Sequence, residues 1–353
     1  MARVLAIICP NGFGHFQRSR RVMAEVLGMN SGVQLEIVCT ARQRAQLADT
    51  DPLAPFADRV RWHEDLLGPA VHWSLDPEDY ADGRLVNWSA ALDVLALDRF
   101  DLVVSDNMSG VLEQRADALL MGSFLWSDIL DSAYPGHAQV ERFVQHERNL
   151  LQQHRPEMIC IDGLAMPGVL ARTCALPVPW MCESVLPPDT AREVLPPTVA
   201  LLGNSSVIGG CDLKALADGL QQAGISVSTP PAWQIGEPFG YAPADFAACS
   251  AVICRPGIGT LTDAVATSTP VVVVHEAGNT EMTHNGIAIA ALGFGLNLAT
   301  ADTAVVLRSL LALMQDRPTL VTMSRQIAAA KKNGLEVAAK HVLQRLEQAD
   351  TDD

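Results

Sequence analysis

The sequence is poor in aromatic and basic residues, and it has no long apolar run. Aromatic residues make up 5% of the 353 positions, and 25 Lys and Arg stand against 40 Asp and Glu, giving a net charge of −15 at pH 7. A field of that sign repels a phosphate backbone, so we expect no nucleic-acid partner. No window approaches the roughly 20 apolar residues of a membrane helix, and the start lacks a signal-peptide pattern. We therefore expect a globular, cytoplasmic protein without a transmembrane segment.

Several motifs of known chemistry are also missing. The eight cysteines form no C-x-x-C pair, which favours buried thiols over disulfides or zinc. No G-x-x-x-x-G-K-[ST], H-E-x-x-H or G-x-S-x-G occurs, which argues against a P-loop, a zinc protease helix or a nucleophile elbow. Asp49-Thr50-Asp51 resembles a metal-binding D-x-D, but it follows a helical pattern. We expect no bound metal and no cofactor.

Short apolar runs alternate with helical patterns along the chain, which predicts parallel sheets covered by helices. At about 150 residues per domain, the length suggests two domains. Proline pairs at 187–188 and 196–197 mark a boundary because they suit neither helices nor central strands. We expect an α/β fold with Rossmann-like domains over 1–185 and 198–353, a linker over 186–197, and a last helix free to cross back. The weak pattern over 51–97 predicts loops and short helices.

The first candidate site is the turn after the first strand. Gly12 and Gly14 let a ligand approach the backbone, and His15 lies in the first helical turn, where the helix dipole disfavours a charged imidazole. An uncharged ring suits a general base, although a capping histidine fits equally well. Arg18 completes the motif, and Asp106, expected just past the strand 102–104, could orient His15 or be a turn former. A dinucleotide fingerprint is disfavoured, since Gln17 replaces its third glycine.

The second candidate site lies in the other half of the chain. A glycine-rich turn opens a helix there, and the outward N–H groups of such a turn attract an anion such as a diphosphate. Asp263 has acceptor oxygens for a ribose diol, and Glu281 and Asn285 share a face of the following helix. Ordinary turn and capping roles remain open for these residues. The candidate donor-site residues are Asn204, Arg255, Gly257, Gly259, Thr260, Asp263, Glu281 and Asn285.

Together, these motifs resemble the GT-B glycosyltransferase superfamily across both halves of the chain. The likeness is to the branch of the lipid II-forming GlcNAc transferase and the nucleotide-sugar hydrolase of pseudaminic acid synthesis. It is carried by G-x-G-H-x-x-R at 12–18 and by the segments 255–263 and 281–285. The sequence departs from the transferase pattern at Asp263, where the family has Glu, at Thr269 for Gly, and at Gly286 for Ala; the usual glutamine ahead of Asn285 is also missing.

The resemblance implies two doubly wound domains facing across a cleft. The second would bind a nucleotide-diphosphate sugar, with UDP favoured, placing Gly257 to Thr260 on the diphosphate and Asp263 on the ribose. The first would bind a small-molecule or lipid-linked acceptor at Gly12, Gly14 and Arg18 and would supply His15 as the base. We expect metal-independent sugar transfer with inversion. Two alternatives remain: a hydrolase with water as acceptor, and a binding protein without catalysis. Tryptophans between 62 and 88 suit a bulky organic acceptor.

Overall fold

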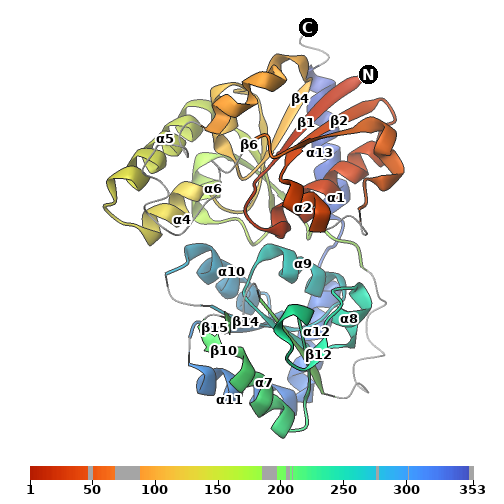
Figure 1. Ribbon diagram of the computed structural model, residues 1–353, viewed down its shortest axis with the longest axis vertical. Coiled ribbons are helices and arrows are strands. Elements are labelled where there is room, and N and C mark those ends of the chain that lie inside the picture. Colours follow the sequence, from red (N-terminus) through yellow and green to blue (C-terminus); the bar gives the residue numbers. More distant parts are fainter. Residues whose placement is uncertain are drawn as a thin grey trace. The chain divides into compact units, whose positions relative to one another are not determined.

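The computed structural model describes residues 1–46, 51–67, 88–184, 197–203, 207–208, 210–275, 278–300 and 302–349. The chain divides into two compact units, the first formed by 1–181 and 333–353 and the second by 182–332. Each unit has its own parallel sheet with helices packed on it (Figure 1). Of the expected linker 186–197, only Pro197 lies among the described residues.

The first unit is built on a seven-stranded sheet in the order β3-β2-β1-β4-β5-β6-β7, and every neighbouring pair is parallel. Its strands are β1 (Ala2–Ile8), β2 (Val33–Cys39), β3 (Val60–Glu64), β4 (Leu102–Asp106), β5 (Leu119–Met121), β6 (Glu157–Ile161) and β7 (Cys174–Val178). The chain runs outward from β1 to β3 and then returns to the other side of β1 with β4. The strand order therefore reverses between β1 and β4, where open α/β sheets bind their ligands.

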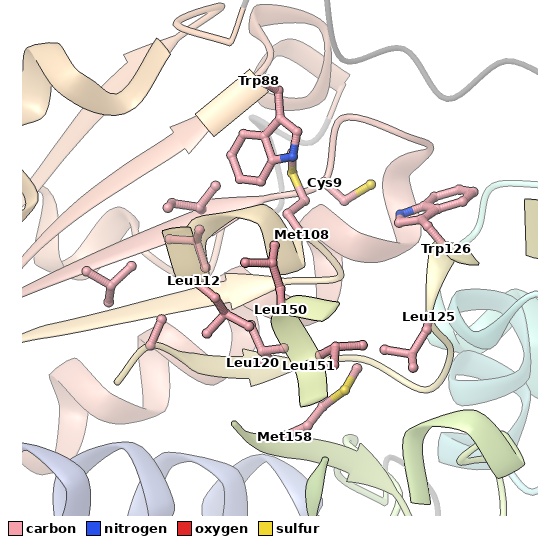
Figure 2. Close-up of a cluster of buried hydrophobic side chains, with 14 of the residues drawn as sticks. Cys9, Trp88, Met108, Leu112, Leu120, Leu125, Trp126, Leu150, Leu151 and Met158 are labelled. Carbon is pink, nitrogen blue, oxygen red and sulfur yellow. The ribbon is translucent and has the colours of Figure 1, made fainter. Parts of the chain in front are cut away.

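Helices and 3-10 turns connect these strands. The helices are α1 (Phe13–Met29), α2 (Ala41–Gln46), α4 (Trp126–Ala133), α5 (Ala138–His154) and α6 (Pro167–Arg172). The 3-10 turns are η2 (Ala54–Arg59), η5 (Trp88–Leu95), η6 (Leu97–Arg99) and η7 (Ser109–Glu113). One face of the sheet packs with these connections into an apolar core that includes Cys9, Trp88, Met108, Leu120 and Trp126 (Figure 2).

The last helix, α13 (Gly334–Ala349), belongs to the first unit and packs on α1, β4 and β7 (Figure 1). Its buried residues recur at helical spacing, at Leu335, Ala338, Val342 and Leu346. A Cβ on Gly334 would lie 2.0 Å from the carbonyl oxygen of Pro179. Only glycine fits so close to this carbonyl oxygen. The glycine therefore lets α13 begin directly against the segment around Pro179.

The second unit has a six-stranded parallel sheet in the order β12-β11-β8-β13-β14-β15. Its strands are β8 (Thr198–Leu202), β11 (Ser226–Thr229), β12 (Glu237–Pro238), β13 (Ala251–Cys254), β14 (Val271–Val274) and β15 (Gly295–Leu298), and a small antiparallel pair is formed by β9 (Val207–Ile208) and β10 (Cys211–Asp212). Here the order reverses between β8 and β13, so the turn after β13 lies at the ligand-binding position of this sheet.

The helices of the second unit alternate with its strands. They are α7 (Leu213–Gln222), α8 (Pro243–Ala248), α9 (Ile258–Ala266), α10 (Thr280–Ala291), α11 (Thr303–Gln315) and α12 (Arg317–Ala329), with the 3-10 turn η8 (Pro231–Trp233). Among the described residues of the whole chain, no helix is both long and apolar enough to cross a bilayer.

Two expectations from the sequence need correction. The stretch 51–97, expected as loops and short helices, includes the edge strand β3, whose burial pattern shows no strong alternation. Asp106, expected in the turn beyond its strand, is the last residue of β4 and pairs with Ile8 in the sheet register. Seven of the eight cysteines are buried, as expected, and Cys174 is exposed. Burial raises the pKa of the Cys254 thiol to about 12, so it stays protonated at neutral pH.

Candidate functional site

In the first unit, the candidate site forms at the turn between β1 and α1. Gly12 is the N-cap residue of α1 and has a φ of 73°, which disfavours any residue with a Cβ. Phe13, Gly14 and His15 follow in the first turn, and none of them is acidic. Their backbone N–H groups have no acceptor within the helix, because the first four of any α-helix lack one. The turn therefore presents donors and the positive end of a helix dipole.

A buried glutamine that the sequence did not single out supports this turn. The Gln43 side chain donates from Nε2 to the carbonyl oxygens of Cys9, at 2.8 Å, and Gly12, at 3.0 Å. The Oε1 atom of Gln43 accepts a hydrogen bond from the backbone N–H of Thr40. In return, the hydroxyl of Thr40 accepts a hydrogen bond from the backbone N–H of Gln43. This reciprocal pair is the pattern of a capping box, and its T-x-x-Q spacing was the available signal. Gln43 thus fixes the glycine turn to the start of α2.

His15 and Asp106 are brought together across the β1–β4 switch point. The His15 Nδ1 atom lies 2.7 Å from Asp106 Oδ1, and the imidazole keeps 15% of its surface exposed while the carboxylate keeps 1%. A neutral ring whose Nδ1 donates to the carboxylate has Nε2 as its basic atom. This arrangement holds an imidazole in a fixed tautomer at a partly open position.

Asp106 is ionised despite its burial. Burial opposes its charge, but the Arg18 charge and the hydrogen bonds from His15 and Arg18 outweigh that effect, so the pKa of Asp106 lies below its ordinary value. Arg18 donates to both carboxylate oxygens, from Nη2 to Oδ1 at 2.6 Å and from Nε to Oδ2 at 3.1 Å. The Ser19 hydroxyl donates to Oδ2 at 2.6 Å. Residues 15, 18 and 19 share one helix face at i, i+3 and i+4, which is the signal that could have found Ser19.

Aromatic residues from the connection between β5 and α4 pack beside His15. The Phe124 ring meets the imidazole edge-on, with the ring centroids 6.0 Å apart, and Trp126 packs edge-on against Phe124. Asn107, at a φ of 54°, donates from Nδ2 to the carbonyl oxygen of Phe124 at 2.8 Å. A Cβ on Gly122 would lie 1.8 Å from Asn107 Oδ1, so this glycine makes room for the asparagine.

In the second unit, the expected donor-site turn lies at the switch point between β8 and β13. Gly257 is the N-cap residue of α9, and the first turn of the helix contains Gly259 and Thr260 but no acidic residue. Arg255 and Asp263 are partly exposed on either side of that helix start. The structure therefore places these five predicted residues on one turn and one helix. Asn204 lies outside the described residues.

Asn285 connects the next helix to the same turn. Its side chain, 1% exposed, donates from Nδ2 to the carbonyl oxygen of Pro256 at 2.9 Å. Its Oδ1 is buried and has no hydrogen-bond partner among the described residues. Glu281 lies one turn earlier, in the partly exposed first turn of α10. The structure thus brings Asn285 against the β13–α9 turn, while Glu281 sits at the start of a neighbouring helix.

A partly buried polar pair lies beside Gly286. His275, the residue after β14, makes a 2.9 Å hydrogen bond through Nε2 to Asn297 Oδ1 on β15. A Cβ on Gly286 would lie 2.5 Å from that oxygen and 3.1 Å from His275 Nε2. An alanine at this position would therefore collide with the pair. Gly286 therefore leaves room for the hydrogen-bonded pair of His275 and Asn297 beside α10.

The remaining sequence candidates lie either outside the described residues or away from these clusters. Asp49 and Thr50 of the D-x-D triplet lie outside the described residues, and Asp51 pairs with Arg20 at 3.6 Å. Of the tryptophans from 62 to 88, Trp73 lies outside the described residues, Trp62 packs under Arg44, and Trp88 is in the core. Within the described ranges, no group of three or more His, Cys, Asp or Glu side chains is placed to hold a metal ion.

Comparisons with known proteins bear on both units. Residues 234–342 match the model of the glycosyltransferase family 28 C-terminal domain, a span that includes α9 and α10. A search among curated protein sequences gives no match.

Solved structures are similar over nearly the whole chain. The calicheamicin glycosyltransferase CalG4 is 16% identical, with a TM-score of 0.63 and coverage of 98% of this chain and 99% of that one. LpCGTa, in complex with UDP, is 15% identical, with a TM-score of 0.69 and coverage of 98% and 99%. Medicago truncatula UGT71G1, complexed with UDP-glucose, is 10% identical, with a TM-score of 0.66 and 98% coverage of both chains. This likeness confirms the expected GT-B fold.

Proposed function

From the GT-B fold of the chain and the match of residues 234–342 to the family 28 C-terminal domain, we propose a glycosyltransferase function. The protein transfers a sugar from a nucleotide diphosphate to an acceptor hydroxyl. The observation that carries the catalytic part is the 2.7 Å contact between His15 Nδ1 and Asp106 Oδ1. This contact supports His15 as the base at the switch point of the first sheet, and the glycine turn before α9 supports a diphosphate site at the switch point of the second.

The donor belongs to the second unit in this proposal. The backbone N–H groups from Gly257 to Thr260 bind the diphosphate, Arg255 adds positive charge, and Asp263 accepts from the ribose hydroxyls. Structures similar to this chain hold UDP or UDP-glucose, which supports a UDP-type donor. The helix dipole and the guanidinium stabilise the charge that develops on the departing diphosphate, which is the role a metal ion plays in other transferases.

The acceptor reacts at the first unit. As the acceptor oxygen bonds to the anomeric carbon, its proton passes to His15 Nε2, and the sugar–phosphate bond breaks with its electron pair going to the diphosphate. Asp106 holds the ring in the tautomer that leaves Nε2 free. A single displacement of this kind inverts the anomeric configuration. The glycine turn 12–14 and the aromatic rings beside His15 line the acceptor position, which suits a small-molecule or lipid-linked acceptor.

In this proposal, the free state of the cysteine thiols supports a reducing compartment. All eight cysteines are free, and free thiols persist in a reducing compartment. We therefore assign the reaction to the cytoplasm.

A panel of nucleotide diphosphates and their sugars tests the donor assignment. UDP at about 100 times its Kd should stabilise the folded protein by about 2.7 kcal/mol, seen as a higher melting temperature. Arg255→Met should weaken this shift, whereas Arg308→Met, which removes an exposed arginine from α11 of the same unit, should not. Absence of a shift with every nucleotide diphosphate would reject the donor site.

Product analysis then separates the three functions. A transferase releases the nucleotide diphosphate at a rate that rises with an acceptor and forms a glycosylated product. Free sugar released at one rate with and without acceptors would mean hydrolysis. A melting shift with no sugar release from any donor, across a broad acceptor panel, would mean a binding protein.

A further inference from the structure

Asp106 has more partners than a residue that only orients a histidine. Its Oδ1 atom receives hydrogen bonds from both His15 Nδ1, at 2.7 Å, and Arg18 Nη2, at 2.6 Å. Its Oδ2 atom receives bonds from Arg18 Nε, at 3.1 Å, and the Ser19 hydroxyl, at 2.6 Å. The same Arg18 Nη2 atom lies 3.4 Å from His15 Nδ1. The imidazole thus shares its carboxylate with a permanent cation and touches that cation directly.

This sharing changes the electrostatics of a histidine–carboxylate pair. A buried carboxylate alone favours the doubly protonated, positive ring, because opposite charges at contact distance stabilise each other. Here a guanidinium, which carries a positive charge at neutral pH, already balances the carboxylate. A positive ring would be the second cation on one anion. The arrangement therefore keeps the orienting hydrogen bond but leaves no unbalanced negative charge on Asp106 to pair with a positive ring.

Among the residues that the structure describes, the other groups facing the cluster add no negative charge. From the end of β1 comes the Cys9 thiol, whose pKa is raised well above its ordinary value, chiefly by burial, so that it is neutral. Phe124 from the β5–α4 connection and Trp126 from the start of α4 carry no charge. From the end of β4, Asn107 contributes a neutral amide whose Oδ1 accepts from Arg18 Nη2 at 3.3 Å. Ser19 is likewise neutral.

We propose that Arg18 is a positioning residue that keeps His15 uncharged at neutral pH by balancing Asp106, and that it does not bind the acceptor. This proposal rests on the proposed role of His15 as the base. Its geometry also separates Arg18 from the acceptor role expected from the motif, because the side chain is 9% exposed and is occupied by Asp106. In the G-x-G-H-x-x-R pattern, the histidine is then the base, and the arginine one helical turn later is the cation that keeps the base uncharged.

The primary test follows the protonation of the ring itself. The protein is labelled with 15N and 13C in histidine, and the His15 signals are assigned by their loss in His15→Gln. At pH 7 the native ring should carry one proton, on Nδ1. In Arg18→Met, the pH at which half the rings are doubly protonated should rise by about one unit or more, since a contact charge moves titration by that amount. Arg18→Lys, which keeps the charge, should stay near the native value.

A matched control uses the same helix. Arg21→Met removes the same charge six residues from His15 and should leave the titration of the ring unchanged. Equal midpoints in native protein, Arg18→Met and Arg21→Met would overturn the proposal. If Arg18→Met does not fold, the native protein decides: a ring already doubly protonated at pH 7 overturns the proposal, and a singly protonated ring in both native protein and Arg18→Lys supports it.

The pH dependence of turnover provides the second readout. In Arg18→Met, the acidic limb of the kcat/KM profile should move to higher pH by the same amount as the NMR midpoint, with a smaller change in acceptor KM. A large rise in acceptor KM with an unmoved limb would instead make Arg18 an acceptor ligand. If no donor is turned over by the native protein, the proposed function fails, but the NMR titration still tests the inference.

Discussion

Asn285 reaches from the middle of α10 to the carbonyl oxygen of Pro256 and so ties this helix to the turn that precedes α9. The donor nitrogen and the carbonyl lie 2.9 Å apart, although the residues are 29 positions apart in the chain. The turn that precedes α9 is therefore braced from outside its own segment. Its position depends on the packing of α10 as well as on its own glycines.

Loss of this bond should weaken donor binding more than the chemical step. Asn285→Ala leaves the Pro256 carbonyl without its hydrogen-bond donor, which destabilises the turn by about 1–3 kcal/mol. Part of this loss should appear as weaker donor binding. We expect donor KM to rise about tenfold with a smaller fall in kcat. Ser309→Ala removes a comparable side-chain bond, to the Val305 carbonyl within α11, and should leave donor KM unchanged. Equal effects of the two variants would contradict the bracing role.

Removal of the His15 imidazole should slow turnover without loosening the donor. His15→Ala should lower kcat about a hundredfold or more, the usual contribution of a positioned general base. The affinity for UDP, measured by calorimetry, should stay within about twofold. His63→Ala is the control, because His63 also pairs with a carboxylate in the first unit, Glu36, at 2.6 Å. Full activity in His15→Ala would dismiss His15 as the base.

A methyl group at position 286 should disturb the buried pair beside α10. Gly286→Ala places a Cβ against Asn297 Oδ1 and should break the His275–Asn297 hydrogen bond, destabilising the second unit by about 1 kcal/mol. For a unit of this size, that corresponds to a melting temperature about 2–4 °C lower. Asn297→Ala in the same chain should remove the collision, so the double variant should lose less than the sum of the two single variants. Strict additivity would argue against the contact.

Glu147 should make stability fall as pH rises. It lies buried on α5 and accepts from the Ser109 hydroxyl and the Ser127 N–H, each at 2.5 Å. Burial outweighs these bonds and raises its pKa above the ordinary value. The folded state therefore holds the proton more tightly than the unfolded state, in which a glutamate has a pKa of about 4.3. The stabilisation is complete below that pH and is lost as pH rises through the higher folded value.

The measurement compares urea unfolding across that pH range. Glu147→Gln should flatten the decline of the unfolding free energy with rising pH, whereas Glu141→Gln, an exposed position on the same helix, should not. A native and a Glu147→Gln protein with the same pH slope would show that this carboxyl is not responsible.

Much of the fold follows from the sequence because its signals are local. The apolar run 33–39 predicts β2 to the residue, and the strand at 271–274 likewise matches β14. Edge strand β3 was missed because an edge strand needs no continuous apolar run, and Trp62 and His63 read as polar loop. The helix start at Phe13 has no clear signal in the sequence, since a glycine N-cap offers no side-chain acceptor.

The candidate site follows from the sequence only in part. The glycine turns and His15 are short motifs, so they are visible, and Asp106 was proposed from its place near a strand end. Ser19, Gln43 and Asn107 contribute through contacts between segments far apart in the chain. The pairing of Arg18 with Asp106, 88 residues away, has no local signature at all. Sequence motifs thus identify the reactive group more readily than the residues that set its charge.

Because α13 returns to the first sheet, the first unit is a discontinuous domain and the second is inserted within it. The chain passes from one to the other twice, after residue 181 and after residue 332. A stop codon near residue 333 would therefore leave the second unit whole and damage the first, by uncovering the apolar surface of α1 that α13 buries. Residues 182–332 are the segment to express as an independent fragment, whereas the first unit requires both of its pieces.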